Sequence, residues 1–199
     1  MIRIKQYINT IFSSNTYLLW KDKEKDCFLV DCGDTNQLIK EVHKLGLNPI
    51  GVFLSHAHFD HIYGLNELLT VFPLVKIYTT KFGHDALLSQ KLNLSKYHQT
   101  PFELSYPSAI HIIEKNCDFL SVWGSDLKII HVPGHNPSCL AYFLDKYLFS
   151  GDAFIPGHEV VISVPLANKP LALKNYNILK QLSAGYVVCP GHGEIVSLK

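Results

Sequence analysis

Hydrophobic positions divide the chain into strand-like and helix-like segments. Short apolar runs bounded by turn residues are typical of buried strands, and they occur at SSNTYLLW (13–20), CFLVDCGD (27–34), PIGVFLSH (49–56), VKIYTT (75–80), LKIIHV (127–132), CLAYFLDKYLFS (139–150) and YVV (186–188). Three longer segments are predicted to be helices: TNQLIKEVHKLG (35–46), IYGLNELLTVFP (62–73) and KPLALKNYNILKQLSA (169–184). Because strands alternate with helices over two comparable halves, the pattern predicts an α/β fold.

The segment SHAHFDH (55–61) concentrates four groups that can titrate or bind a cation, between a predicted strand and a predicted helix. These groups are His56, His58, Asp60 and His61. A metal site, an acid/base cluster and a polar loop that happens to be rich in histidine would all fit this composition. Protonated imidazoles repel one another, whereas neutral imidazoles and a carboxylate are common ligands of zinc and neighbouring metals. We therefore favour a metal site, which needs further ligands elsewhere in the chain.

Three other segments share a design in which an apolar strand ends at a tight turn with a metal-binding side chain. HVPGHNPS places His135 in this position, YLFSGDAF places Asp152 and YVVCPGHG places His192. A glycine lies beside each of them, as tight turns often require. Since open α/β sheets build their sites at the carboxyl ends of strands, we expect these side chains to meet the SHAHFDH segment at one sheet edge.

In this order, the motifs HxHxDH, PGH, GD and PGHG resemble those of the metallo-β-lactamase-fold hydrolase superfamily. The resemblance extends from about Asn15 to His192, nearly the whole chain. It implies an αββα sandwich with two mixed sheets flanked by helices, and we interpret residues 1–199 as a single domain of this kind. SSNTYLLW and CFLVDCGD resemble the family's opening hairpin, whose terminal Asp31 would support the site from behind.

The resemblance also implies a dinuclear metal site. One ion would be held by His56, His58 and His135. A second ion would be held by Asp60, His61 and His192, and the carboxylate of Asp152 would bridge the two ions. We expect two divalent ions, with zinc as the expected metal and iron or manganese as alternatives. Such a pair would hold a hydroxide that attacks a polarised carbonyl, and Asp60 would act as a catalytic residue that orients it.

Within the superfamily, SHAHFDHIYGLNELL and LFSGDAF resemble short glyoxalase-II-like thioesterases, so we expect a metal-dependent hydrolase of a small thioester or ester. Two features depart from glyoxalase II. Only seven residues follow His192, without the helical domain that holds glutathione there, and IPGHEVVISV replaces the Gly-Arg usually found shortly after GD. The β-lactamases of this fold have Cys or Ser where this chain has Asp152, which argues against antibiotic hydrolysis.

Two hypotheses from different functional classes stay open. A persulfide-dioxygenase-like oxidoreductase would bind a single iron through two histidines and one aspartate, and it would leave Asp60, His61 and His192 without a metal. A binding or regulatory module would keep the fold without turnover. The complete set of ligand candidates argues against both hypotheses.

Length and composition fit an enzyme that acts on small molecules. The chain has 199 residues, of which 47% are hydrophobic, enough for a sizeable core. No apolar run approaches the ~20 residues that span a bilayer, and MIRIKQYINT lacks the apolar region of a signal peptide, so we expect a cytoplasmic protein without a membrane partner. With 18 basic and 17 acidic residues the net charge is +1, which predicts no nucleic-acid partner. The oligomeric state stays open.

Two segments could shape a substrate pocket. Residues 81–110 are too polar throughout for a core element, and their aromatic side chains could form an apolar rim: Phe82, Tyr97, Phe102 and Tyr106. A helix followed by a surface loop that merely carries these aromatics fits the segment equally well. The second segment is FIPGHEVVISVPL (154–166), which must pass close to the metals. We interpret His158 within it as a rim histidine that faces water.

Overall fold

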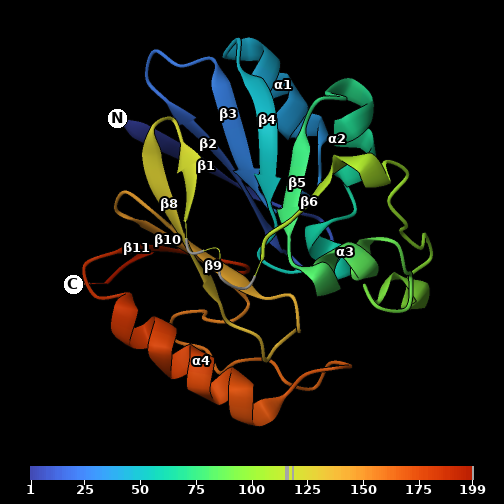
Figure 1. Cartoon of the computed structure of the whole chain (residues 1–199), viewed down its shortest axis with the longest axis vertical. Helices are drawn as coiled ribbons and strands as arrows, with labels where there is room; N and C mark the ends of the chain where they lie inside the picture. The colour runs from blue at the N-terminus through green and yellow to red at the C-terminus, as the bar shows by residue number, and fades with distance from the viewer. Residues whose placement is uncertain (115–116, 118, 199) are drawn as a thin grey trace.

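The computed structural model describes residues 1–198 except 115, 116 and 118, and these residues form two sheets packed face to face (Figure 1). The first sheet has the strand order β1-β2-β3-β4-β5-β6, with the bounds Ile2–Ile8, Asn15–Lys21, Asp26–Val30, Asn48–Phe53, Lys76–Thr79 and Ile110–Ile112. The second sheet has the order β12-β11-β10-β9-β8-β7. Strands β7 to β12 span Phe119–Val122, Ser125–His131, Leu140–Leu144, Tyr147–Gly151, Val187–Pro190 and Val196–Ser197.

Both sheets are mixed, which confirms the predicted architecture. In the first sheet β1, β2 and β3 pair antiparallel, and β3, β4, β5 and β6 pair parallel. In the second sheet β10 and β11 form the parallel pair, and the other neighbours are antiparallel. The charged run at residues 21–26 contains the turn between β2 and β3.

Helices supply the crossovers that parallel strands need. The helices are α1 (Asn36–Lys44), α2 (Leu65–Val71), α3 (Lys81–Leu87) and α4 (Lys169–Leu182). The three helices predicted from the sequence coincide with α1, α2 and α4 to within a few residues. Figure 1 shows α1 and α2 on the outer side of the first sheet and α4 on the outer side of the second. Among the residues described, no helix has the length and apolar character needed to cross a bilayer.

The alternation of side chains along the central strands divides the core into layers. Leu18, Leu29 and Val52 pack in a cluster with residues of α1 and α2. Their strand neighbours Leu19 and Phe28 point to the opposite face and pack against the second sheet. Because successive strand residues face opposite sides, the near-continuous apolar runs of these strands serve two buried faces at once.

The carboxyl ends of the parallel strands from both sheets meet at one edge of the sandwich. The backbone N–H of Leu140, at the start of β9, donates to the Ser55 carbonyl that follows β4 at 2.8 Å. The N–H of Asn15, at the start of β2, donates to the Gly191 carbonyl that follows β11 at 2.7 Å. The Gly191 N–H also donates to the Gly151 carbonyl at the end of β10 at 3.0 Å. These contacts bring the loops after β4, β10 and β11 together, and these loops carry the predicted ligands except His135, which follows β8.

The buried hydroxyl of Tyr142 in β9 links the two sheets by a hydrogen bond. It donates a hydrogen bond of 2.7 Å to the Leu54 carbonyl, directly after β4. We expect Tyr142→Phe to lower the free energy of unfolding by about 1–3 kcal/mol, because a buried carbonyl loses this partner. Urea unfolding followed by circular dichroism measures the loss. Tyr147→Phe in β10 is the control, since within the described part of the chain its hydroxyl donates no bond to the first sheet; equal losses would contradict the bridging role.

Candidate metal centre

The loop after β4 turns four side chains toward one point. His56 lies three positions after the last residue of the strand, Phe53, and a 3-10 turn at Phe59–His61 then brings Asp60 and His61 back beside it. The turn closes where the His61 N–H donates to the His58 carbonyl at 3.0 Å. The imidazole centroids of His56 and His61 consequently lie 4.3 Å apart. With the spacing HxHxDH, a single tight turn after the strand is therefore enough to bring the four side chains together.

Asp31, at the end of β3, fixes this loop from behind, where the resemblance places it. Its carboxylate accepts hydrogen bonds from the Ser55 N–H at 2.7 Å and from the Ser55 hydroxyl at 2.6 Å. The same carboxylate lies 2.9 Å from Nδ1 of His61. Asp31 has a φ of +58°, a conformation that aspartate tolerates better than most residues. With Nδ1 of His61 held by Asp31, Nε2 is directed into the cluster.

Three histidines form the first ligand group. Nδ1 of His58 lies 3.1 Å from Nε2 of His56 and 3.0 Å from Nε2 of His135. One Nδ1 carries at most one proton and can donate to only one of these two nitrogens. A cation that accepts lone pairs from all three nitrogens removes this conflict, so the geometry fits a metal better than a hydrogen-bond network.

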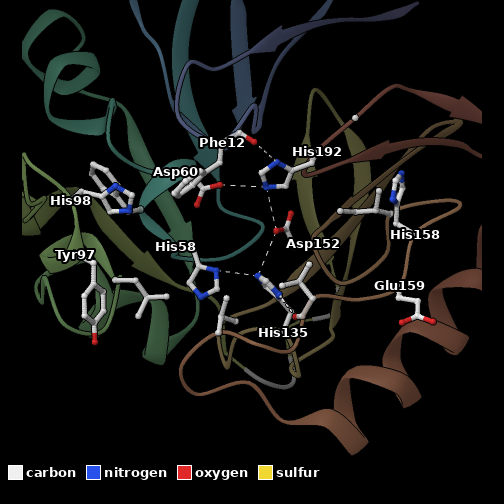
Figure 2. A pocket seen from close by; sticks show the side chains of 16 residues that line it. Phe12, His58, Asp60, Tyr97, His98, His135, Asp152, His158, Glu159 and His192 are labelled. Carbon is white, nitrogen blue, oxygen red and sulfur yellow. Dashed lines mark hydrogen bonds and ion pairs between the residues drawn. The ribbon is translucent and has the colours of Figure 1, made fainter.

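An aspartate and two histidines form the second group, and Asp152 lies between the two groups. Oδ2 of Asp60 is 3.3 Å from Nε2 of His61 and 3.3 Å from Nε2 of His192. Oδ2 of Asp152 is 3.5 Å from Nε2 of His135 and 3.4 Å from Nε2 of His192, and its Oδ1 is 3.6 Å from Nε2 of His61. Figure 2 shows Asp152 at the centre, with dashed lines to His135 and His192. Its carboxylate therefore contacts members of both groups.

The donor atoms fit divalent metal ions in both chemistry and spacing. Nitrogen ligands about 2.0–2.1 Å from a tetrahedral ion lie roughly 3.3 Å from one another, and the contacts within the cluster run from 3.0 to 3.6 Å. Nε2 of His61 and Oδ1 of Asp152 are buried and have no hydrogen-bond partner. Buried polar atoms of this kind are costly unless a ligand satisfies them.

The opposite ring nitrogens are tied to fixed acceptors. Nδ1 of His135 donates to the Val161 carbonyl at 2.7 Å, and Nδ1 of His192 donates to the Phe12 carbonyl at 3.1 Å. Nδ1 of His56 lies 3.1 Å from the Ser55 hydroxyl. A proton on Nδ1 leaves the Nε2 lone pair free, so these contacts select the tautomer that binds a metal.

Burial keeps the imidazoles of His56 and His58, two members of the first group, neutral. Burial, followed by the charges of the neighbouring histidines, lowers the pKa of His56 well below its usual value. Burial and the nearby His135 lower the pKa of His58 to about 3. Because a neutral imidazole keeps its lone pair, these two histidines can bind a cation at neutral pH without first losing protons.

In the second group, nearby carboxylates raise the pKa values of the histidines instead of leaving them lowered by burial. Burial opposes the charge of His61, but Asp60, Asp152 and Asp31 raise its pKa well above the usual value. Burial also opposes the charge of His192, yet its bonds to Asp152 and Asp60 raise its pKa to about 9. Burial alone would raise the pKa of Asp60 and of Asp152, but the adjacent histidines lower both. These ligands favour positive charge between them, and a divalent ion supplies it on displacing the histidine protons.

Glycine backbone packs directly against the central carboxylate. A Cβ on Gly191 would lie 1.9 Å from Oδ1 of Asp152, and a Cβ on Gly151 would lie 2.6 Å from Cβ of Ser55. Gly151 also has a φ of +51°, in the left-handed region that favours glycine. The glycines of the GD and PGHG motifs therefore let the loops after β10 and β11 approach closely enough to place Asp152 and His192.

A cavity of about 660 Å³ opens beside the cluster (Figure 2). Side chains of the cluster form its floor, among them His58, Asp60 and His135. Residues from two irregular segments form the walls: Leu94, Tyr97 and His98 in one, and Ile155, His158, Glu159, Val161 and Val164 in the other. The cavity is large enough for a small substrate, and both walls are mainly apolar.

The structure brings together all seven predicted ligands, and His158 lies on the exposed cavity rim as interpreted from the sequence. Of the two interpretations of residues 81–110, a helix followed by a surface loop fits the structure better than an aromatic rim. Among its four aromatics only Tyr97 lines the cavity, because Phe102 is buried in the core and Tyr106 contacts Thr70 on α2.

Several functional neighbours carry no signal in the sequence. Phe12 and Val161 contribute backbone carbonyls, which any residue type would supply. His98 lines the cavity between the rings of Phe12 and Phe59, with centroids 5.3 and 4.6 Å away. Ser55 could have been suspected from its place in the SHAHFDH segment, and the remaining positions could not.

Two mixed sheets whose parallel strands end at a buried cluster of histidines and aspartates define an α/β protein with a candidate metal centre. Residues 9–192 match the family described as the metallo-beta-lactamase superfamily, and the chain belongs to this superfamily. The family inferred from the sequence motifs and its fold are both confirmed.

Individual relatives agree with this assignment. The protein described as hydroxyacylglutathione hydrolase in Buchnera aphidicola subsp. Baizongia pistaciae (strain Bp) is 27% identical over 177 residues, which are 89% of this chain. The chain spans only 60% of that relative's length. The crystal structure of the BLEG-1 B3 metallo-beta-lactamase has a TM-score of 0.89 and 26% identity, covering 98% of this chain and 94% of the other. The structure of TTHA1623 in a di-iron-bound form has a TM-score of 0.81 and 22% identity, covering 97% and 94%, and it shares the fold.

We expect the purified protein, saturated with metal, to contain about two transition-metal ions per chain, because the ligands form two groups around one carboxylate. Elemental analysis after removal of unbound metal measures this number. His192→Ala should lower it toward one ion, since His192 belongs only to the second group. His111→Ala, on β6, is the control and should leave it unchanged. A single ion at saturation, together with full binding by His192→Ala, would contradict two sites.

Proposed function

We propose that this chain is a metal-dependent hydrolase of small thioesters or esters. The position of Asp152 between the two ligand groups carries this proposal, because one carboxylate with an oxygen toward each group suits a pair of ions that share a ligand. A mononuclear site would leave the second group of ligands without a purpose.

Each ligand group has a distinct part in the proposed site. The first ion would be held by His56, His58 and His135, and the second by Asp60, His61 and His192, with Asp152 shared. When bound, ions held by these residues would supply a hydroxide near neutral pH and would polarise a carbonyl oxygen. The zinc expected from the sequence fits this nitrogen-rich set, and iron or manganese could replace it.

The surrounding protein groups orient the reaction. Asp60 lines the cavity as well as contacting His61 and His192, so it can orient the attacking water toward a substrate in the cavity. Asp31 and the Val161 carbonyl hold His61 and His135 in the tautomers that the reaction needs. The apolar walls exclude bulk water, which strengthens the electrostatic interactions with a developing oxyanion.

Similarity to the Buchnera protein described as hydroxyacylglutathione hydrolase supports thioester cleavage at the level of the superfamily. A second candidate is β-lactam hydrolysis, because the BLEG-1 B3 metallo-beta-lactamase overlaps nearly the whole chain. An aspartate at position 152, where the sequence resemblance leads us to expect Cys or Ser in β-lactamases, favours the first candidate. Neither a single-iron dioxygenase acting on persulfides nor a module without turnover would need the second ligand group.

A substrate panel separates these candidates. We expect metal-replete protein to release thiol from small acyl thioesters or to cleave aryl esters, since the polarised carbonyl is common to both. Thiol release, phenolate release, β-lactam opening and oxygen uptake are recorded in parallel, with S-lactoylglutathione, N-acetylcysteamine thioesters, aryl esters, nitrocefin and glutathione persulfide as substrates. Cleavage of nitrocefin alone would favour the second candidate. Oxygen uptake with the persulfide, or inactivity throughout, would contradict the proposal.

Removal of Asp152 should cost more activity than removal of the rim histidine. Asp152→Ala takes a carboxylate from both ligand groups, and we expect a loss of at least about a hundredfold in kcat/KM. His158→Ala should cost less than about fivefold, since His158 is exposed and lies at the end of the cavity wall. Rates on any accepted thioester or ester, with metal content measured on the same samples, provide the comparison. Equal losses would show that the shared carboxylate is not central to activity.

A further inference from the structure

The two walls of the cavity differ in charge as well as in position. Figure 2 shows Tyr97 and His98 on one side of the cluster, and His158 and Glu159 on the other. Besides the cluster residues Asp60 and Asp152, Glu159 is the acidic side chain that lines the cavity. The side chains opposite it are aromatic or aliphatic, apart from the imidazole of His98.

The backbone holds Glu159 at the rim. The preceding turn has Pro156 at its second position and Gly157, with a φ of +80°, at its third, and the His158 N–H donates to the Ile155 carbonyl at 3.1 Å. This is the pattern of a type II turn, whose proline and glycine adopt their required conformations without strain. Two residues after Glu159, the Val161 carbonyl accepts the bond from Nδ1 of His135. Glu159 is thus anchored on both sides along the chain.

The cations near the cavity lie outside it. In the described part of the chain, no lysine or arginine lines the cavity. Nζ of Lys96 lies over the ring of Tyr97, 4.6 Å from its centroid, on the wall opposite Glu159. Lys180 of α4 lines an adjoining hollow that Glu159 also borders, so it screens the Glu159 charge in part. A substrate carboxylate at this rim would meet the Glu159 charge, with the rim imidazoles of His98 and His158 nearby but no lysine or arginine within the described lining of the cavity.

We propose that Glu159 determines specificity, so that the cavity takes thioesters or esters with an apolar group and with a neutral or cationic, not an anionic, part at the rim. Glu159 is exposed, so solvent screens its charge on the outer side, but the apolar walls limit this screening on the side that faces the cavity, where like charges repel. A quaternary ammonium group is attracted both by Glu159 and by the aromatic face of Tyr97. This inference rests on the proposed hydrolase function and narrows its substrate class.

Matched thioesters test the inference. One series has a phenylacetyl group on thiocholine, N-acetylcysteamine or 3-mercaptopropionate, and so places a positive, zero or negative charge on the thiol half. A second series joins N-acetylcysteamine to 4-trimethylammoniobutanoyl, pentanoyl or 4-carboxybutanoyl, and so places the same charges on the acyl half. For the half that faces Glu159, we expect kcat/KM of the cationic and neutral members to exceed that of the anionic member by about threefold to tenfold. Glu159→Gln should reduce this ratio, and Glu159→Lys should invert it.

Glu24→Lys is the matched charge reversal. Glu24 lies in the turn between β2 and β3, and β2 runs from that turn to Asn15, which binds the Gly191 carbonyl beside the cluster. Because Glu24 is at the far end of β2, its reversal should leave both ratios unchanged. As a second readout, calorimetry with benzyltrimethylammonium should give a Kd that rises about threefold to tenfold in Glu159→Lys and not in Glu24→Lys. Circular dichroism establishes that each variant is folded.

The outcomes separate this inference from the function on which it rests. Cleavage of the neutral thioesters with ratios that Glu159→Lys leaves unchanged in both series would overturn the role of Glu159 and leave the hydrolase intact. A preference of the unchanged protein for the anionic members would have the same meaning. Release of thiol from none of the six substrates, together with no cleavage of aryl esters by the same metal-replete protein, would overturn the hydrolase function and this inference with it.

Discussion

The site depends on holding five imidazoles and two carboxylates within one small and largely buried cluster. Charged groups resist such burial unless each has a partner. The protein meets this cost by giving ligand atoms that face away from the cluster a fixed acceptor, such as Asp31 for His61 and the Val161 carbonyl for His135. The inner atoms are left facing one another at distances that suit a metal. The left-handed backbone conformations of Asp31 and Gly151 accompany this close packing of the ligand loops.

Much of the ligand set could be predicted because it is encoded locally. His56, His58, Asp60 and His61 lie within one turn after a strand, so their spacing alone indicates a shared site. Asp152 and the two remaining distant ligands were recognisable from strands that end at glycine-containing turns. Strands β8, β10 and β11 run in the same direction, because β9 lies antiparallel between β8 and β10 and because β10 pairs parallel with β11, so their ends meet at one edge. The main strands and helices were predictable for a similar reason, since the spacing of hydrophobic residues along the sequence differs between a buried strand and a helix that buries one face.

The walls of the cavity could not be predicted in the same way. Residues 81–110 have no consistent period, and Phe102 is buried because the chain folds back on α3, where the Leu104 N–H bonds the Leu87 carbonyl. No pattern in the sequence separates such a buried aromatic from Tyr97, which is exposed at the cavity. Backbone acceptors such as the Val161 carbonyl are equally invisible, because every residue type has one. In this superfamily member, then, local motifs encode the chemistry, and irregular segments shape the surface presented to the substrate.

The cluster also joins the two halves of the sandwich. The loop after β4 in the first sheet provides four of its ligands, and loops after β8, β10 and β11 in the second sheet provide the remaining three. An ion that binds only when both sheets are in place acts as a removable cross-link, and its binding free energy adds to the cooperativity of the fold by mass action. Unfolding of the loaded protein then requires release of ligands from both sheets, so resistance to heat and to proteolysis becomes a function of free metal concentration. Metal supply in the cell would in this way set the lifetime of the protein as well as its activity.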